Sequence, residues 1–232
     1  MITNYIFLTI FGLAPSVVWL LFFLQEDRRR PEPKGLLLST FFWGAVVTFY
    51  VLPIQIILRN LLVAAGLGEL HPIFLFWLAG VEEVLKFAIV FLWVNRRKDF
   101  DEPIDAMIYM IVAALGFAAV ENVATALRAP NSFELLTMRF IGATLLHGLA
   151  SGLIGYYWAK GIIKNRVWQM ILIGLLIATI LHSIFNYLML NFGPGIKVTS
   201  FLIFLAFFVL ADFEKLKKPF AVGLRSPSLH SV

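Results

Sequence analysis

Three charged side chains lie in the middle of one long apolar run, and they constrain this chain more than any other feature. The run covers residues 72–94, which is long enough to cross a bilayer as a helix, and its centre reads GVEEVLK. A charge at the centre of a membrane helix costs roughly 3 kcal/mol on insertion scales. Glu82, Glu83 and Lys86 must therefore pair with other groups or face water.

Helical geometry separates the two glutamates. Glu82 and Lys86 are four residues apart and share one face of a helix, so they can pair, although the sequence leaves open which glutamate pairs with Lys86. Glu83 points about 100° away from Glu82 and needs a partner from another helix or a wet cavity. Ionisable groups inside a membrane usually mark a functional site, and we favour that interpretation here. The alternative is a structural ion pair that joins two helices.

The overall composition predicts a polytopic helical membrane protein. The chain has 232 residues, of which 60% are hydrophobic and 23 are Phe, and its mean hydropathy is +0.88. No soluble domain needs so much apolar surface. The sequence has no Cys, which excludes disulfides, Cys-ligated zinc and a thiol nucleophile. No basic stretch is interleaved with aromatic residues, so we expect no nucleic-acid partner.

Seven apolar runs predict an all-α bundle of about seven transmembrane helices. Their approximate limits are residues 5–24, 35–63, 72–94, 104–127, 135–159, 167–190 and 198–211. We expect residues 1–214 to form a single transmembrane domain. Residues 215–232 are expected to be a basic cytoplasmic tail that is partly disordered.

The distribution of Lys and Arg predicts the orientation of this bundle. Four basic residues lie in residues 25–34, three in 95–103, three in 160–166 and four in the tail, whereas the intervening loops are poor in them. Basic loops remain on the cytoplasmic side of a membrane. The N-terminus is therefore predicted to lie outside and the C-terminus in the cytoplasm.

Other polar groups within the apolar runs are predicted to lie at the same depth as the acidic pair. They are Glu121 and Asn122 in the fourth run, His147 in the fifth, and His182 and Asn186 in the sixth. At about 1.5 Å per residue, Glu82, Glu121 and His182 lie roughly 15, 10 and 12 Å below the outer helix ends, and His147 lies roughly 18 Å below. One layer in the outer half of the membrane therefore holds Glu82, Glu83, Glu121, His147 and His182. The alternative for each His alone is an interhelical hydrogen bond.

These residue types suit a hydrolase that activates water. Two His and one carboxylate form a catalytic zinc set, for which Glu121, His147 and His182 are the candidate ligands. Glu82 or Glu83 would then act as the general base. There is no HExxH motif, so the ligands would come from three helices.

A metal-free scheme uses the same residues. A glutamate could activate water directly, while His182 and Asn186 stabilise an oxyanion. Lys86 and Asn122 are expected to support the site, Asn122 either by orienting Glu121 or by bonding a neighbouring helix.

Taken together, these motifs resemble the PrsW family of intramembrane proteases. The matching segments are VEEVLK, FAAVEN (residues 117–122), His147 on the next helix, and HSIFN (residues 182–186). The chain departs from the family pattern at Asn186, where some members have Asp, and at Val81, where a third acid often stands. The family also has an acidic stretch before the fourth helix. Here this stretch includes Glu102, to which we assign a structural or gating role because it lies roughly 25 Å from Glu121.

The resemblance implies a protease in the plasma membrane of a bacterium or archaeon. Such an enzyme makes the first cut in a single-span membrane protein, typically an anti-sigma factor, on its outer side. The family is related to the prenyl-protein (CAAX) and bacteriocin-processing membrane proteases. These relatives are read as glutamate-dependent, whereas the set of Glu121, His147 and His182 favours a metal. The expected cofactor is therefore Zn²⁺, with glutamate-activated water and no cofactor as the alternative.

Two other classes of function fit the same buried carboxylates. An ion-coupled transporter could use them as a proton or cation relay. A non-catalytic membrane scaffold could retain the fold alone, although a scaffold would not need all five ionisable residues of the layer. We see no inverted repeat of the kind that many transporters have, which favours the protease.

Overall fold

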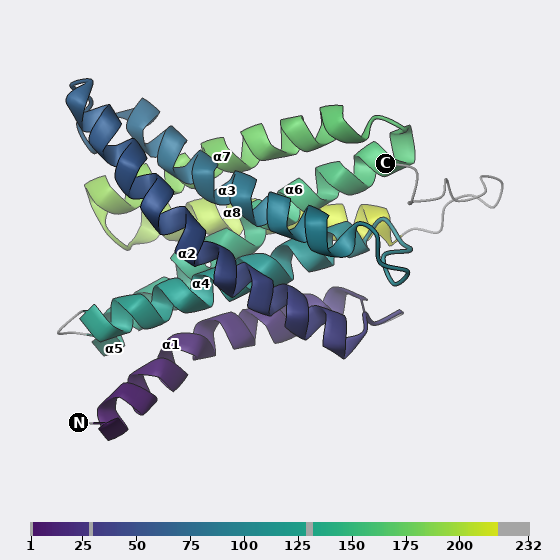
Figure 1. Cartoon of the computed structure of the whole chain (residues 1–232), viewed down its shortest axis with the longest axis horizontal. Helices are drawn as coiled ribbons and strands as arrows, with labels where there is room; N and C mark the ends of the chain where they lie inside the picture. Colours follow the sequence, from purple (N-terminus) through teal and green to yellow (C-terminus); the bar gives the residue numbers. More distant parts are fainter. Residues whose placement is uncertain (1, 28–29, 129–131, 218–232) are drawn as a thin grey trace.

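The described part of the chain consists of helices joined by short turns. The computed structural model describes residues 2–27, 30–128 and 132–217 (Figure 1). Backbone N–H and C=O groups in hydrocarbon must be satisfied within the chain, which apolar runs of this length achieve as helices. The elements are α1 (Ile2–Phe23), η1 (Leu24–Asp27), α2 (Lys34–Ala64), α3 (Pro72–Val94), α4 (Asp105–Arg128), α5 (Ser132–Ile141), α6 (Ala143–Lys164), α7 (Val167–Phe192) and α8 (Ile196–Leu216).

The prediction of an all-α membrane bundle is confirmed. Six helical segments within the described residues are long and apolar enough to cross a membrane, with α5 and α6 forming one of them. The predicted seventh span is α3, which has a sufficient 23 residues but carries the three central charges. The orientation of the bundle stays a prediction. So does the division at residue 214: α8 continues to Leu216, and residues 218–232 lie outside the described part.

One predicted span is divided into two helices. The apolar run at residues 135–159 belongs to α5 and α6, which are separated at Gly142. The N–H of Gly142 still donates to Met138 O at 2.9 Å, but its backbone leaves the helical region at φ −90° and ψ −102°. The short helix α5 is therefore separate from the longer helix α6.

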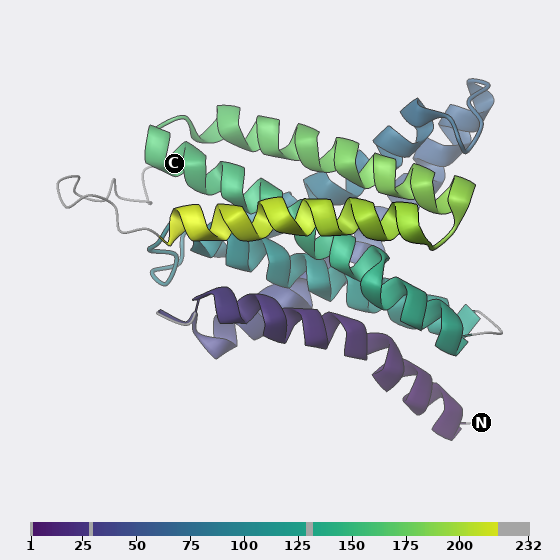
Figure 2. The same cartoon turned by 180° about the vertical axis from the view of Figure 1, so that it is seen from behind.

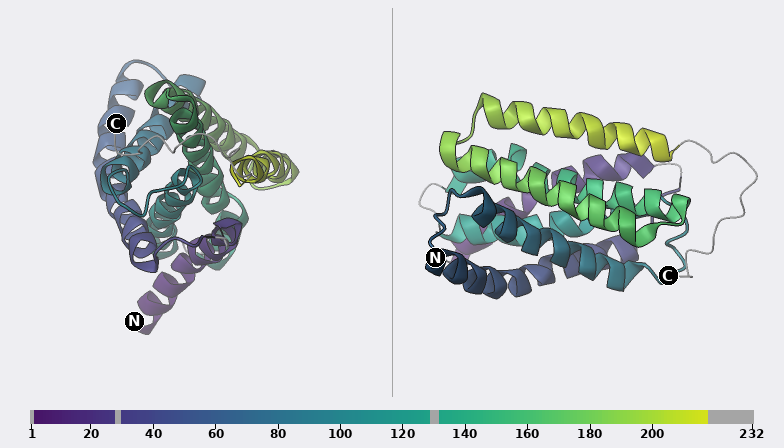
Figure 3. Two further views of the ribbon diagram at one scale, coloured as in Figure 1. Left: turned by 90° about the vertical axis from the view of Figure 1, so that its right-hand side faces the viewer. Right: turned by 90° about the horizontal axis from the view of Figure 1, so that it is seen from above.

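Helix α4 lies at the centre of the bundle. All its residues from Asp105 to Ala119 are buried, and it packs against α1, α2 and α6. Helix α3 packs between α2 and α7, and α8 lies at the edge against α6 and α7 (Figures 2 and 3). The four helices that carry the predicted ionisable residues, α3, α4, α6 and α7, thus meet inside the bundle.

The start of α3 fixes the depth of the acidic pair. The His71 side chain accepts a hydrogen bond from the N–H of Ile73 at 3.2 Å, and Pro72 occupies the first helical position. Both are start signals, because a cap satisfies a free N–H and proline lacks one. Glu82 consequently lies ten residues, about 15 Å, from the end of the helix.

A second polar cluster lies at the opposite end of α4, where the chain enters α2. The Tyr109 hydroxyl donates to Glu32, and Asp105 Oδ2 accepts from the backbone N–H groups of Asp101 and Glu102 at 2.9 and 2.8 Å. Burial raises the pKa of Glu32 above its usual value. Glu102 also pairs with Arg30 at 2.5 Å, which agrees with its predicted structural role.

Helices α2 and α4 cross with their backbones in contact. A Cβ atom on Gly116 would lie 2.0 Å from Phe41 O, and one on Gly44 would lie 2.0 Å from Ala113 O. Real Cβ atoms essentially never approach other atoms so closely, so only glycine allows this crossing.

We predict that Gly116→Ala lowers the free energy of unfolding by at least about 1–3 kcal/mol, because the added methyl group forces the two helices apart. Denaturant titration in mixed micelles would measure the change. The matched control is Gly35→Ala, since Gly35 has no atom within 4 Å of its Cβ position. A neutral Gly116→Ala variant would contradict the close crossing.

Candidate active site

The charges of α3 are buried and paired. Glu83 and Lys86 are completely buried and Glu82 nearly so. Lys86 Nζ donates to Glu83 Oε1 at 2.6 Å. Glu82 instead accepts from Gln55 of α2, with Nε2 donating to Oε1 at 2.8 Å. The sequence left open which glutamate pairs with Lys86, and the structure assigns that role to Glu83.

Glu83 joins three helices through hydrogen bonds. Besides Lys86, its Oε1 atom is 2.8 Å from His182 Nδ1 on α7. Its Oε2 atom accepts from Ser151 Oγ on α6 at 3.3 Å. Glu83 accepts in all three contacts. Two of its partners come from other helices, as the sequence predicted. The bond to Nδ1 leaves the opposite nitrogen of His182, Nε2, available.

Glu121 of α4 holds His147 in a similar way. Glu121 Oε2 is 2.9 Å from His147 Nε2 and 3.0 Å from Arg139 Nη2 on α5. Arg139 Nε also donates to Asn122 Oδ1 at 2.6 Å. The Asn122 amide in turn donates to Thr144 Oγ1 at 2.9 Å. Arg139 thus links α5 to both polar residues of the FAAVEN segment.

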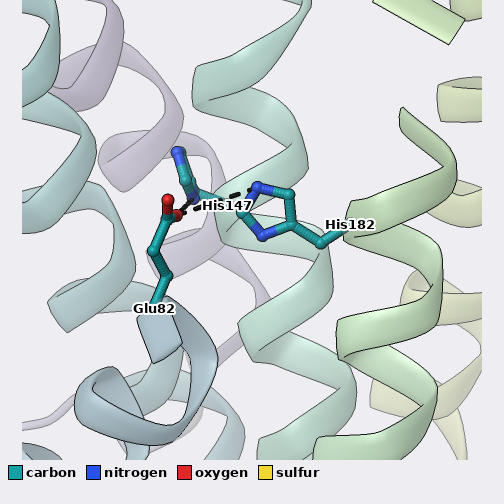
Figure 4. A group of neighbouring side chains, drawn as sticks. All are labelled: Glu82, His147 and His182. Carbon is teal, nitrogen blue, oxygen red and sulfur yellow. Dashed lines mark ion pairs between the residues drawn. The ribbon is translucent and has the colours of Figure 1, made fainter. Parts of the chain in front are cut away.

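The remaining oxygen of Glu82 faces both histidines. Among the described residues, Glu82 Oε2 is buried and has no hydrogen-bond partner. It lies 3.8 Å from His182 Nε2 and 4.0 Å from His147 Nδ1. Figure 4 shows the Glu82 carboxylate directed at the two imidazole rings, which come from α7 and α6. An unpaired buried carboxylate oxygen needs a proton, a water molecule or a cation.

Glu82, His147 and His182 fit a metal ion by this geometry. Their donor atoms all lie within 4.8 Å of one another. Two ligands of a tetrahedral Zn²⁺ at about 2.1 Å are about 3.4 Å apart, so small side-chain rotations suffice. Each His also bonds a carboxylate through its other nitrogen, as metal-bound histidines usually do. One group opposes a metal: the Lys86 ammonium lies 3.1 Å from His147 Nδ1.

The group brought together by the structure differs from the ligand set we predicted in one residue. Glu82 is the carboxylate of this group, whereas we had predicted Glu121 as the ligand. Glu121 instead bonds Nε2 of His147, the nitrogen that faces away from Glu82. All five predicted ionisable residues nevertheless meet at one depth. Gln55 and Arg139 were missed as site residues. A polar amide within the predicted second span was a signal for Gln55.

A cavity of about 420 Å³ lies next to the Glu82, His147 and His182 group, on the side of the bundle where α3 begins. Each helix of the site contributes to it a residue one turn from its own polar group. These residues are Leu78 for Glu82, Thr125 for Glu121, Ala143 for His147 and Asn186 for His182. Arg139 lines the cavity as well. On all four helices the cavity thus lies on the same side of the site, one turn away from it.

A family model and the curated relatives of this chain carry the same family name. A family model described as "PrsW family intramembrane metalloprotease" matches residues 32–211, which include every candidate site residue. Similar curated proteins are named "Protease PrsW". The protein from Geobacillus kaustophilus is 30% identical over 77% of this chain and 78% of its own length. That from Bacillus subtilis is 28% identical over 88% and 93%. No solved structure matches the chain.

We predict that Lys86 is energetically coupled to Glu83 more strongly than to Glu82. Lys86→Met and Glu83→Gln should each lower the free energy of unfolding by about 3–5 kcal/mol, because each leaves the other charge buried without its partner. The double variant should lose clearly less than the sum of both. Denaturant titration in mixed micelles measures all three variants.

The matched control is the cycle of Lys86→Met with Glu82→Gln, for which the coupling should be small. A larger coupling for Glu82 than for Glu83 would show that the spacing of four residues sets the pair after all.

Proposed function

The chain belongs to the PrsW family of intramembrane proteases, and from that premise we propose that it cleaves a single-span membrane protein near the end of the bundle where α3 begins. The observation that carries this proposal is the free Glu82 oxygen facing two histidines beneath a cavity. The Lys and Arg distribution predicts that this end lies outside the cell. The substrate class that fits is an anti-sigma-factor-like protein in the plasma membrane.

The cavity suits an unwound peptide segment better than a helix. An α-helix with its side chains is about 10–12 Å wide, and its carbonyl groups are already hydrogen-bonded. A cavity of about 420 Å³ holds only a short stretch of chain. A segment that leaves its helix near the membrane surface could place one peptide bond above Glu82. Arg139 and Asn186 offer hydrogen-bond donors at the wall of the cavity.

In the scheme without metal, Glu82 is the residue that we propose as the general base. Its Oε2 atom is free to accept a proton from water, whereas Glu83 is already occupied by Lys86, His182 and Ser151. A base must lie within hydrogen-bond reach of the proton that it removes. Glu83 and Glu121 instead fix the orientation of His182 and His147. Asn186, which lines the cavity, would stabilise the negative charge that develops on the peptide oxygen.

Glu82, His147 and His182 would hold a Zn²⁺ ion, which when bound supplies a Lewis acid and lowers the pKa of its water. The Glu82 oxygen would then be one of its ligands. Without metal, Glu82 activates water itself. Both schemes place Glu82 at the centre, and both depend on the histidine orientations set by Glu83 and Glu121.

The arrangement of α4 favours a protease over an ion carrier. Between Tyr109 and Glu121 this helix has only apolar residues and glycine, and they are buried up to Ala119. The acidic cluster around Glu32 and Asp105 is therefore separated from the site by an apolar segment of more than two turns. A relay of protons or cations would need polar groups along that distance.

We predict that Glu82→Gln lowers cleavage of a single-span substrate in liposomes by at least about 10²-fold, because the variant loses either the general base or a ligand of the metal. Appearance of the cleaved product on gels measures the rate. Glu134→Gln, at an exposed residue of α5, is the matched control and should cleave normally. A folded Glu82→Gln variant that cleaves at the wild-type rate would refute this role.

Metal content separates the two chemical schemes. We expect about one zinc per chain in protein purified without chelator, lost in Glu82→Gln and His182→Ala but retained in Glu121→Gln, which lies outside the ligand group. Elemental mass spectrometry measures this directly. If an actively cleaving preparation contains no metal, water is activated by Glu82 alone.

A further inference from the structure

A second cavity, of about 350 Å³, lies between α6, α7 and α8 at the opposite end of the bundle from the active site. Its polar lining consists of Tyr156, Tyr157, Lys160, Asp212 and Lys215, and we call it the Tyr–Lys cavity. Its remaining walls are apolar side chains that include Leu153, Leu181 and Phe208. No residue of the candidate active site contributes to it.

The Tyr–Lys cavity is polar at one end and apolar at the other. Along α6, Lys160 lies seven residues beyond Leu153, and along α8, Lys215 lies seven residues beyond Phe208. Each interval corresponds to about 10 Å along the helix. Both lysines lie near the ends of their helices, and both apolar residues lie deeper in the span. The cavity therefore changes from polar to apolar along the direction of a lipid molecule.

The charges at the polar end do not balance. Lys215 Nζ pairs with Asp212 Oδ1 at 2.6 Å. Within the described residues, Lys160 has no carboxylate partner; its Nζ lies over the rings of Tyr156 and Tyr157, at 5.7 and 5.5 Å. Two ammonium groups thus share one carboxylate, which leaves one positive charge. Aromatic rings attract a cation only weakly at an exposed site, so an anion would add a stronger partner.

We propose that the Tyr–Lys cavity binds an anionic phospholipid, with its phosphate at Lys160 and Lys215 and an acyl chain along Leu181 and Phe208. A free phosphate would leave the apolar walls uncovered. A phosphatidylcholine headgroup would bring its own cation towards the lysines. Basic pockets between membrane helices on the cytoplasmic side are known to suit anionic headgroups. The Lys and Arg distribution predicts that this end of the bundle faces the cytoplasm.

Such a lipid would connect α8 to the helices that carry the histidines. Helix α8 lies at the edge of the bundle and contacts mainly α6 and α7 (Figure 3). A lipid between the three helices adds contacts that α8 alone cannot make. The proposal does not depend on proteolytic activity, because it concerns a site at the other end of the molecule.

Native mass spectrometry of the full chain in detergent tests the proposal. We expect dioleoyl-phosphatidylglycerol to remain bound as one copy per chain, whereas dioleoyl-phosphatidylcholine and inorganic phosphate do not. Lys160→Gln should weaken the binding about fivefold, because each lysine near an anionic surface contributes about that much. Lys160→Gln with Lys215→Gln should weaken it further.

The matched control is Lys98→Gln, which removes the same charge from an exposed position in the turn after α3. Unchanged binding in this control supports a site at the Tyr–Lys cavity. An equal loss in Lys98→Gln would show attraction by overall charge and overturn the proposal. Equal retention of both phospholipids, or release of the lipid by inorganic phosphate, would overturn it as well.

Discussion

The buried ion pair between Glu83 and Lys86 is the interaction on which the polar centre of this bundle depends. Neither charge is accessible, and hydrocarbon offers them no water. Each must therefore find its partners within the protein. Glu83 contacts Lys86 on its own helix, Ser151 on α6 and His182 on α7, so one carboxylate determines how three helices sit side by side. Both oxygens of Glu83 have hydrogen-bond partners, whereas the neighbouring Glu82 has one oxygen without a partner among the described residues.

The apolar part of the structure supplies rigidity around this centre. Helix α4 is enclosed by its neighbours, and at Gly44 and Gly116 it approaches the backbone of α2 too closely for any side chain. Glu121 projects from this fixed helix towards His147, and Arg139 on the separate short helix α5 holds it from the other side. Groups placed on packed helices keep their geometry better than groups on loops. A hydrolytic site requires such fixed geometry.

The sequence predicted the helices and the meeting of the polar residues well, because both follow from counting residues along apolar runs. The run at residues 72–94 corresponds to α3 without change, and counting 1.5 Å per residue placed Glu82, Glu121, His147 and His182 together. The break at Gly142 could not be predicted, since the residues on both sides are compatible with one continuous helix. The choice between Glu82 and Glu121 beside the histidines depends on how the helices pack laterally, which depth does not reveal. The hydrogen bond from Gln55 of α2 to Glu82 joins distant parts of the chain, which the sequence does not reveal.

The hydrogen bonds of the two histidines also determine the electrical state of the site. With both imidazoles neutral, the carboxylates of Glu82, Glu83 and Glu121 face one ammonium, Lys86, and one guanidinium, Arg139. One negative charge is left over, and the only buried oxygen of these three carboxylates without a partner is on Glu82. A low-dielectric interior strongly favours neutrality. Neutrality can be reached by one proton on Glu82, or by a divalent cation accompanied by one further anion. With neutral imidazoles, the site is therefore electrically complete only when Glu82 has taken up a proton or a cation.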